Sequence, residues 1–188
     1  KGIAAEFTKR LAESVKAFNF GAYSDAKSTH GPLITAKAAS NIDAKVQDAV
    51  ANGAKLVCGG KLADTKGYFY PATILTGLDS SMAMFKEEIF GPVAAMYEFE
   101  TEEQAVDMAN DTDFGLASYV YTESMRRSWR VSESLEYGMV GVNETAISSE
   151  VIPFGGVKES GQGREGSKYG LDDYLEIKYI CFGAMNRD

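Results

Sequence analysis

The chain has 188 residues, of which 45% are hydrophobic and 11% aromatic, so it is long enough to bury a core. Its formal net charge of −8 argues against a nucleic-acid or anionic-membrane partner, because either would need a basic patch. No apolar run approaches the roughly 18 residues of a membrane span. Two distant cysteines and a single histidine exclude a disulfide framework and a multi-histidine metal site, so no metal is expected.

Hydrophobic periodicity predicts four helices. Apolar residues at spacings of three and four indicate an amphipathic first helix. Thr35 can cap the second helix, which Asn52 and Gly53 end. Thr101 can cap the third, with Gln104 in the capping-box position. In chain order, the predicted helices cover residues 2–18, 36–51, 101–110 and 124–135.

Short β-prone runs alternate with these helices. Pro71 lies within residues 68–76, and because proline cannot donate to a sheet ladder this run is predicted to be an edge or interrupted strand. Residues 174–182 alternate in part and are predicted to form a late strand that can pair outside its own domain. The alternation predicts an α/β fold with a mostly parallel twisted sheet and flanking helices. The other predicted strands are residues 56–58, 93–99, 117–121 and 138–142.

Residues 152–166 form a glycine-rich stretch, with five glycines in fifteen residues. Glycine at this density loses conformational entropy on folding, which a chain accepts where its backbone needs positive φ or a close approach. The stretch follows a predicted buried strand, and long loops between ordered elements often carry function. A flexible linker is the alternative, although Phe154 and Arg164 are unusual linker residues.

Two polar turns are further candidates for a ligand site. Glu87 and Glu88 precede Phe90 and a Gly-Pro turn, so they can present oxygens to a hydroxylated ligand such as a ribose. The alternative is a solvated acidic pair beside a core phenylalanine. Residues 143–149 follow a predicted buried strand, and ligands of open α/β sheets bind beyond the carboxyl ends of strands. An ordinary polar turn is the alternative there.

The two cysteines give no complete catalytic set. Cys58 is a candidate nucleophile, but no histidine lies near it in the sequence, and a reactive thiolate needs a base, a cation or a helix N-terminus. Cys181 lies in an apolar run. Both are therefore expected to be small core residues. The sequence also contains no dinucleotide fingerprint and no Walker loop.

Three stretches together resemble the C-terminal part of the aldehyde dehydrogenase family, in the same order and spacing. They are EEIFGPV (residues 87–93), GMVGVN (138–143) and PFGGVKESGQGREG (153–166). The resemblance extends from about Gly2 to Gly183. The turn at 147–150, with residues 167–170 and 174–179, is most similar to the succinate-semialdehyde dehydrogenase branch.

The resemblance implies NAD(P)-dependent oxidation of an aldehyde. A cysteine thiolate attacks the aldehyde, hydride passes to the nicotinamide, and a glutamate-activated water releases the acid. By position, Glu88 would hold the nicotinamide ribose hydroxyls and Phe90 would pack by the nicotinamide. Ser148 would bind the far carboxylate of succinic semialdehyde, and Phe154 would line the aldehyde tunnel.

The family's Gly-Gln-x-Cys motif is absent from this sequence. We expect that nucleophile a little upstream of Lys1, with the general-base glutamate and the cofactor domain earlier still. The chain is therefore expected to be an inactive portion of a catalytic domain over residues 1–170, followed by an oligomerisation strand and tail over 171–188.

Further expectations follow from the same resemblance. The parent would be a homo-oligomer that uses NAD or NADP on a small aldehyde, in the cytoplasm or, in a eukaryote, the mitochondrial matrix. Two alternatives stay open: another semialdehyde substrate, such as glutarate semialdehyde, and a non-catalytic assembly module of the same fold.

Overall fold

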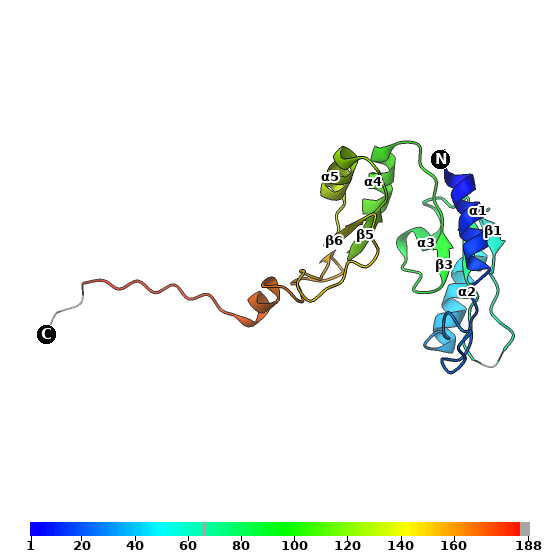
Figure 1. Cartoon of the computed structure of the whole chain (residues 1–188), viewed down its shortest axis with the longest axis horizontal. Coiled ribbons are helices and arrows are strands. Elements are labelled where there is room, and N and C mark those ends of the chain that lie inside the picture. Colours follow the sequence, from blue (N-terminus) through cyan, green and yellow to red (C-terminus); the bar gives the residue numbers. More distant parts are fainter. Residues whose placement is uncertain (66, 185–188) are drawn as a thin grey trace. The chain divides into compact units, whose positions relative to one another are not determined.

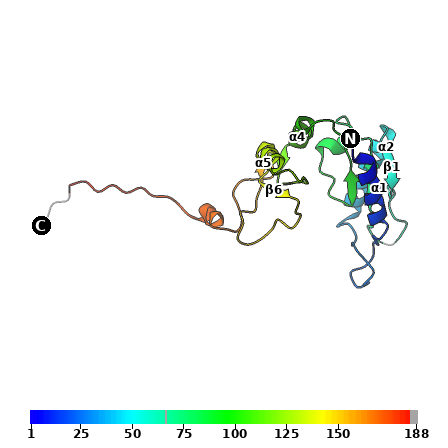
Figure 2. The ribbon, with the colours of Figure 1, turned by 45° about the horizontal axis from the view of Figure 1, so that its top comes forward.

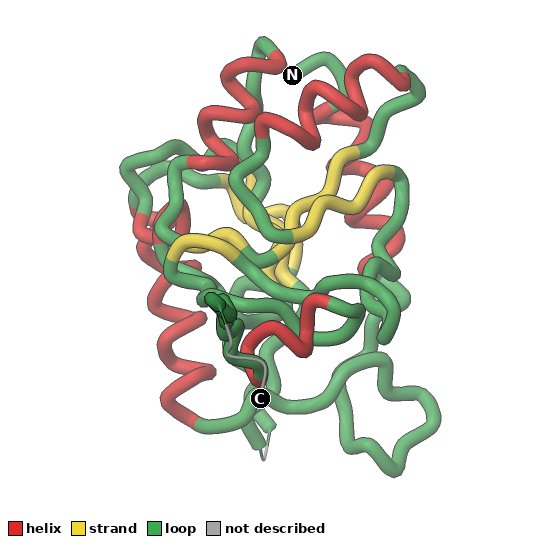
Figure 3. Tube along the Cα trace, turned by 90° about the vertical axis from the view of Figure 1, so that its left-hand side faces the viewer, coloured by secondary structure: helices red, strands yellow, loops and turns green. Residues whose placement is uncertain are grey.

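The chain forms two compact units, Lys1–Ala105 and Val106–Asp188 (Figure 1). The structure is a computed structural model that describes residues 1–65 and 67–184. Both units contain helices and short strands joined by long loops (Figure 3), which confirms the predicted α/β class. None of the helices in the described ranges is long and apolar enough to cross a bilayer.

The first unit begins with two helices whose bounds agree closely with the prediction. They are α1 (Ala4–Val15) and α2 (Ala36–Ala51), and they lie together with β1 in two views (Figures 1 and 2). The Thr35 hydroxyl accepts the Ala38 N–H at 3.1 Å and so caps α2. Past the end of α2, Gly53 adopts a φ of +102°, as expected of a glycine after a helix.

The first unit also holds a three-stranded sheet in the order β1-β2-β3. Strand β2 pairs antiparallel with β1 and parallel with β3. It is the central strand, so of the two predicted alternatives, an edge strand or an interrupted one, the interruption at Pro71 is correct. Because β2 begins after Pro71, the missing N–H of proline removes no ladder hydrogen bond. The bounds are β1 (Lys55–Cys58), β2 (Thr73–Thr76) and β3 (Val93–Ala95).

The core of this unit lies between α2 and the sheet. Ile42, Val46 and Ala49 of α2 occur at spacings of three and four and are all buried. Strand β2 contributes Leu75, which is fully buried. A short helix, α3 (Ala83–Lys86), adds Met84 to the same cluster. The remaining members are Ala54, Tyr70, Leu78 and Met82.

Helix α4 (Glu102–Asn110) crosses the boundary between the units. Thr101 accepts the Gln104 N–H at 3.2 Å, as predicted. The Gln104 side chain in turn accepts the N–H of Glu100, at 2.7 Å, instead of the N–H of the capping threonine.

The second unit contains two small two-stranded sheets and one longer helix. Strands β5 and β6 pair in parallel in unbroken register, whereas β4 and β7 pair antiparallel. The helix α5 is capped by Ser124, whose hydroxyl accepts the Arg127 N–H at 3.3 Å. The bounds are β4 (Phe114–Gly115), β5 (Ala117–Val120), α5 (Met125–Ser134), β6 (Met139–Val142), β7 (Val157–Lys158) and the 3₁₀ helix η1 (Tyr169–Tyr174).

Residues 174–182, predicted to be a late strand that can pair outside its own domain, form no strand within this chain. Tyr174 ends η1, and residues 175–184 have no regular secondary structure. Ile177 is fully exposed and Tyr179 is 86% exposed. A strand needs a partner for its N–H and C=O groups, and no described segment pairs with this one.

We predict that Thr73→Val destabilises the first unit by about 1–3 kcal/mol. The buried Thr73 hydroxyl accepts the Gly60 N–H at 2.8 Å and donates to the Pro71 carbonyl at 2.9 Å, and valine leaves both unpaired. Urea denaturation measures the loss. The control is Thr76→Val on the same strand, since that hydroxyl makes no hydrogen bond in the described chain. Equal stability of the two variants would contradict the prediction.

Candidate functional site

The turn over residues 87–92 has a backbone fixed from two sides. The Lys45 ammonium on α2 donates to the Glu88 carbonyl at 2.6 Å and lies 3.1 Å from the Glu87 carboxylate. The Pro92 carbonyl accepts the N–H of Thr73, on β2, at 2.8 Å. The turn is therefore part of the folded unit although the side chains of Glu87, Glu88 and Phe90 are exposed.

The two residues predicted to bind the cofactor lie on this turn. Phe90 adopts a φ of +51°, which is uncommon for a residue with a bulky side chain and is found at functional sites. Its ring is 81% exposed, and the Glu88 carboxylate is exposed as well. A fixed backbone thus presents a free carboxylate and a free aromatic face two residues apart. The acidic pair is solvated, as the alternative expected, but Phe90 is not a core residue.

The polar turn after β6 is held by hydrogen bonds of the Asn143 backbone and side chain. Asn143 has a φ of +54°, and its N–H donates to the Val120 carbonyl at 2.9 Å. Its side-chain amide accepts the Thr122 N–H and donates to the Thr122 carbonyl, both at 2.8 Å. Asn143 thereby ties the carboxyl ends of β5 and β6 together, and the chain beyond β6 leaves in a defined direction.

Glu144 shapes the next part of this turn. Its carboxylate accepts the N–H groups of Thr145 and Ala146 at 2.8 and 2.9 Å. Hydrogen bonds to the ionised form favour it, so the backbone N–H groups of Ala146 and Thr145 lower the pKa of Glu144. Ser148 follows on the same turn, is exposed, and makes no side-chain hydrogen bond to the described residues. Its hydroxyl is therefore available to a ligand.

The glycine-rich stretch is a folded loop, so the linker alternative is wrong. Phe154 and Glu165 pair as an antiparallel bridge, with N–H to carbonyl distances of 2.9 and 2.7 Å. The Arg164 guanidinium donates to the carbonyls of Gly156 and Gly163 at 2.8 and 2.7 Å. Gly138 packs so closely on this loop that a Cβ there would overlap the Gly155 carbonyl.

Strand β7 fastens the same loop to β4. Lys158 has a φ of +55°, and its ammonium donates to the carbonyls of Asn110 and Thr112 at 2.9 and 3.2 Å. The same ammonium forms an ion pair with Glu136 at 2.6 Å. The Ser160 hydroxyl accepts the Gly115 N–H at 2.9 Å.

The loop lines a cavity of about 600 Å³ in the second unit. Phe154 is half-buried in its wall, beside polar groups that include Arg164 and Asp173. Ser148 does not line this cavity. Each unit therefore carries two of the predicted residues: Glu88 and Phe90 in the first, Ser148 and Phe154 in the second.

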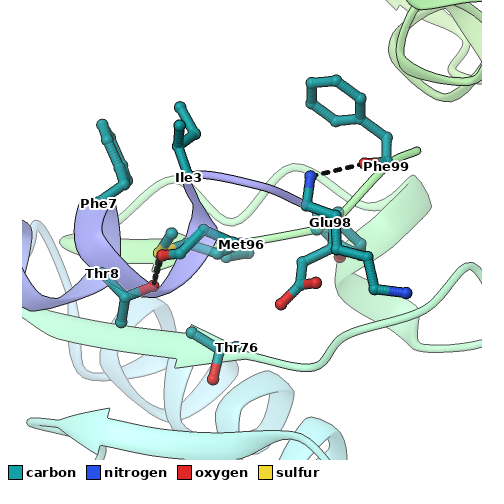
Figure 4. Close-up of a pocket in the computed structure, with 11 residues that line it drawn as sticks. Ile3, Phe7, Thr8, Thr76, Met96, Glu98 and Phe99 are labelled. Atoms are coloured by element: carbon teal, nitrogen blue, oxygen red, sulfur yellow. Dashed lines mark hydrogen bonds between the residues drawn. The ribbon is translucent and has the colours of Figure 1, made fainter. Parts of the chain in front are cut away.

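The first unit has a hollow of its own. It is an apolar groove of about 360 Å³ between α1 on one side and β3 and the residues after it on the other. Figure 4 shows Ile3, just before α1, and Phe7 of α1 on one side and Met96 on the other. The amino terminus closes one end by donating to the Phe99 carbonyl at 2.7 Å. No predicted site residue lines this groove.

Neither cysteine has the surroundings of a nucleophile in the part of the chain that the structure describes. Cys58 is half-buried at the end of β1, and its sulfur contacts the Ala72 carbonyl at 3.9 Å. Cys181 is exposed in the tail, so the expectation that it is a core residue was wrong. The described residues hold no cluster of three or more potential metal ligands.

Sequence reasoning missed Lys45 and Arg164, which hold the two candidate loops in place. Lys45 follows Ile42 by three residues and so lies on the buried face of α2, a position at which a lysine needs a partner. Arg164 follows Gly156 by eight residues and reaches its carbonyl only once the loop is folded.

Residues 1–180 match the profile of the Aldehyde dehydrogenase family. The chain belongs to the aldehyde dehydrogenase family. It is 53% identical over 99% of its length to a mitochondrial succinate-semialdehyde dehydrogenase of Arabidopsis thaliana, of which it covers 35%. It is 49% identical over 97% of its length to a glutarate-semialdehyde dehydrogenase of Pseudomonas putida, of which it covers 38%.

The fold of this chain also matches solved enzyme structures. An E. coli enzyme described as NADP dependent superposes with a TM-score of 0.95 at 46% identity, over 98% of this chain and 38% of that one. The chain thus spans less than two-fifths of the length of the relatives it matches.

We predict that Arg164→Met loosens the loop that carries Phe154. Methionine fills similar space but cannot donate to the carbonyls of Gly156 and Gly163, so these groups lose their partner. Amide hydrogen exchange at Phe154 and Glu165 should accelerate roughly tenfold. Arg126→Met, at an exposed position of α5, is the matched control and should leave both amides unchanged. Unaltered exchange in Arg164→Met would contradict the assignment.

Proposed function

We propose that the chain is the C-terminal part of the catalytic domain of an NAD(P)-dependent semialdehyde dehydrogenase, whose substrate is succinic semialdehyde. The rigid turn that presents Glu88 and Phe90 carries the proposal, because it offers a carboxylate and an aromatic face at a position held by α2. The names of the relatives support the substrate class, since both act on semialdehydes of dicarboxylic acids.

Each predicted residue has a separate task in this proposal. The nicotinamide cofactor supplies the hydride acceptor. The Glu88 carboxylate accepts hydrogen bonds from ribose hydroxyls, and the exposed Phe90 ring covers one apolar face. Both residues are free to do so, as their side chains are exposed. NAD and NADP would both fit these two contacts. Glu88 and Phe90 would touch the nicotinamide end of the cofactor, and not the ribose phosphate that distinguishes NADP from NAD.

Ser148 and Phe154 would recognise the aldehyde. The Ser148 hydroxyl donates to the far carboxylate of succinic semialdehyde, and Phe154 excludes water beside the carbon chain. The thiolate and the general base would come from parts of the dehydrogenase outside these 188 residues, since no described cysteine has a base beside it.

Glutarate semialdehyde is the second candidate substrate, on the strength of the Pseudomonas putida relative. It carries the same terminal carboxylate one methylene further away, so Ser148 could serve it too. For the complete protein we also propose a homo-oligomer in which the exposed apolar tail takes part, located in the cytoplasm or the mitochondrial matrix.

The isolated chain should reduce neither NAD nor NADP in the presence of succinic semialdehyde. Without a nucleophile and a general base no covalent intermediate can form. Nucleotide absorbance measures the reaction, and the complete dehydrogenase is the positive control. Turnover by the isolated chain that Cys58→Ala abolishes would show that these residues carry their own nucleophile.

In the complete dehydrogenase, Ser148→Ala should raise KM for succinic semialdehyde by roughly 10- to 100-fold. The lost hydrogen bond to a charged group is worth ~1.5–3 kcal/mol. An uncharged aldehyde of the same length should be unaffected, because it has no carboxylate. Ser149→Ala is the matched control, since Ser149 is bound to the neighbouring Glu150. Equal effects on both aldehydes would remove Ser148 from the site.

A further inference from the structure

Lys45 is an unusual lysine, because its side chain is only 18% exposed. Lysine is rarely buried unless it is paired. Its ammonium lies 2.6 Å from the Glu88 carbonyl and 3.1 Å from the Glu87 carboxylate, so both of its contacts belong to one turn. The other lysine of α2, Lys37, is exposed.

A second residue of α2 holds the same turn. Ile42 lies one helical turn before Lys45, on the same face of the helix. A Cβ on Gly91 would overlap the Ile42 side chain, so the turn packs directly against it. Helix α2 therefore contacts the turn at residues 88 and 91, on either side of Phe90, whose φ of +51° needs such support.

Of the two carboxylates on this turn, one is paired and the other is left for a ligand. Lys45 pairs with Glu87, whereas the exposed carboxylate of Glu88 makes no ion pair with any described residue. The ammonium binds Glu88 only through its backbone carbonyl, which leaves the side chain free.

We propose that Lys45 is a positioning residue for the nucleotide cofactor. It holds the backbone of the turn over residues 87–92 so that the Glu88 carboxylate and the Phe90 ring point to the ligand, and it does not touch the ligand itself. This inference rests on the proposed function for its ligand, but the positioning of the turn can be tested independently.

The first experiment measures the turn in the 188-residue chain. Chymotrypsin cleaves after exposed aromatic residues, and a rigid backbone resists it. Lys45→Met should accelerate cleavage after Phe90 about tenfold, because a hydrogen bond from a charged group is lost. Lys45→Arg keeps a donor and should restore most of the resistance, and Lys37→Met is the matched control on the same helix. Unchanged cleavage in Lys45→Met would overturn the proposal.

The second experiment measures cofactor binding in the complete dehydrogenase. By fluorescence titration, Lys45→Met should raise Kd for NADH or NADPH about tenfold and leave KM for succinic semialdehyde unchanged. Glu87→Gln keeps the contact with the Glu88 carbonyl and should change Kd less than twofold, because the Glu87 carboxylate is 60% exposed and water screens its ion pair.

These experiments test the role of Lys45 separately from the proposed substrate. An equal loss of cofactor and aldehyde binding would show that Lys45 serves only general stability, which overturns the proposal. If Lys45→Met fails to fold, Lys45→Gln keeps a hydrogen-bond donor without the charge and is measured in its place. A wild-type protein that binds nucleotide but oxidises no semialdehyde would overturn the proposed substrate and not the role of Lys45.

Discussion

The packing of α2 against the sheet is the constraint on which the first unit depends. Ile42, Val46 and Ala49 cover Leu75 of the central strand, and this burial of apolar surface is the main driving force for folding. The same helix carries Lys45 on its inner side, so the helix that builds the core also fixes the turn with Glu88 and Phe90. Stability and the candidate cofactor site are thus coupled through one helix.

The second unit depends on close approach of backbone to backbone. Gly138 and Gly156 lie against neighbouring main chain, and a Cβ at either position would meet backbone or side-chain atoms. Arg164 then binds two carbonyls of the irregular loop, and Lys158 ties the loop to the carbonyls of Asn110 and Thr112 at the end of α4. A loop whose glycine content suggests flexibility is consequently held by several polar contacts. Phe154 therefore has a defined place in the wall of the cavity that this loop lines.

The differences between expectation and structure have one origin, which is that a strand depends on its neighbours. Strand β2 is central because β1 and β3 pair on both its sides, and no local pattern in residues 68–76 reveals this. Residues 175–182 alternate in part but have no partner within the described chain, so the local β-preference is not realised there. Exposure of Cys181 follows from the same cause, because the tail packs on no core.

The sequence by itself determined the elements that local physics controls. The caps at Thr35 and Thr101, the left-handed Gly53 and the apolar face of α2 all follow from the chemistry of neighbouring residues, and the EEIFGPV and PFGGVKESGQGREG stretches identify the family. Only the tertiary structure decided that Lys45 reaches the Glu88 carbonyl and that Arg164 closes the glycine-rich loop. Lys45 and Glu88 are 43 residues apart, so their contact exists only once helix and sheet have packed, and no local pattern encodes it.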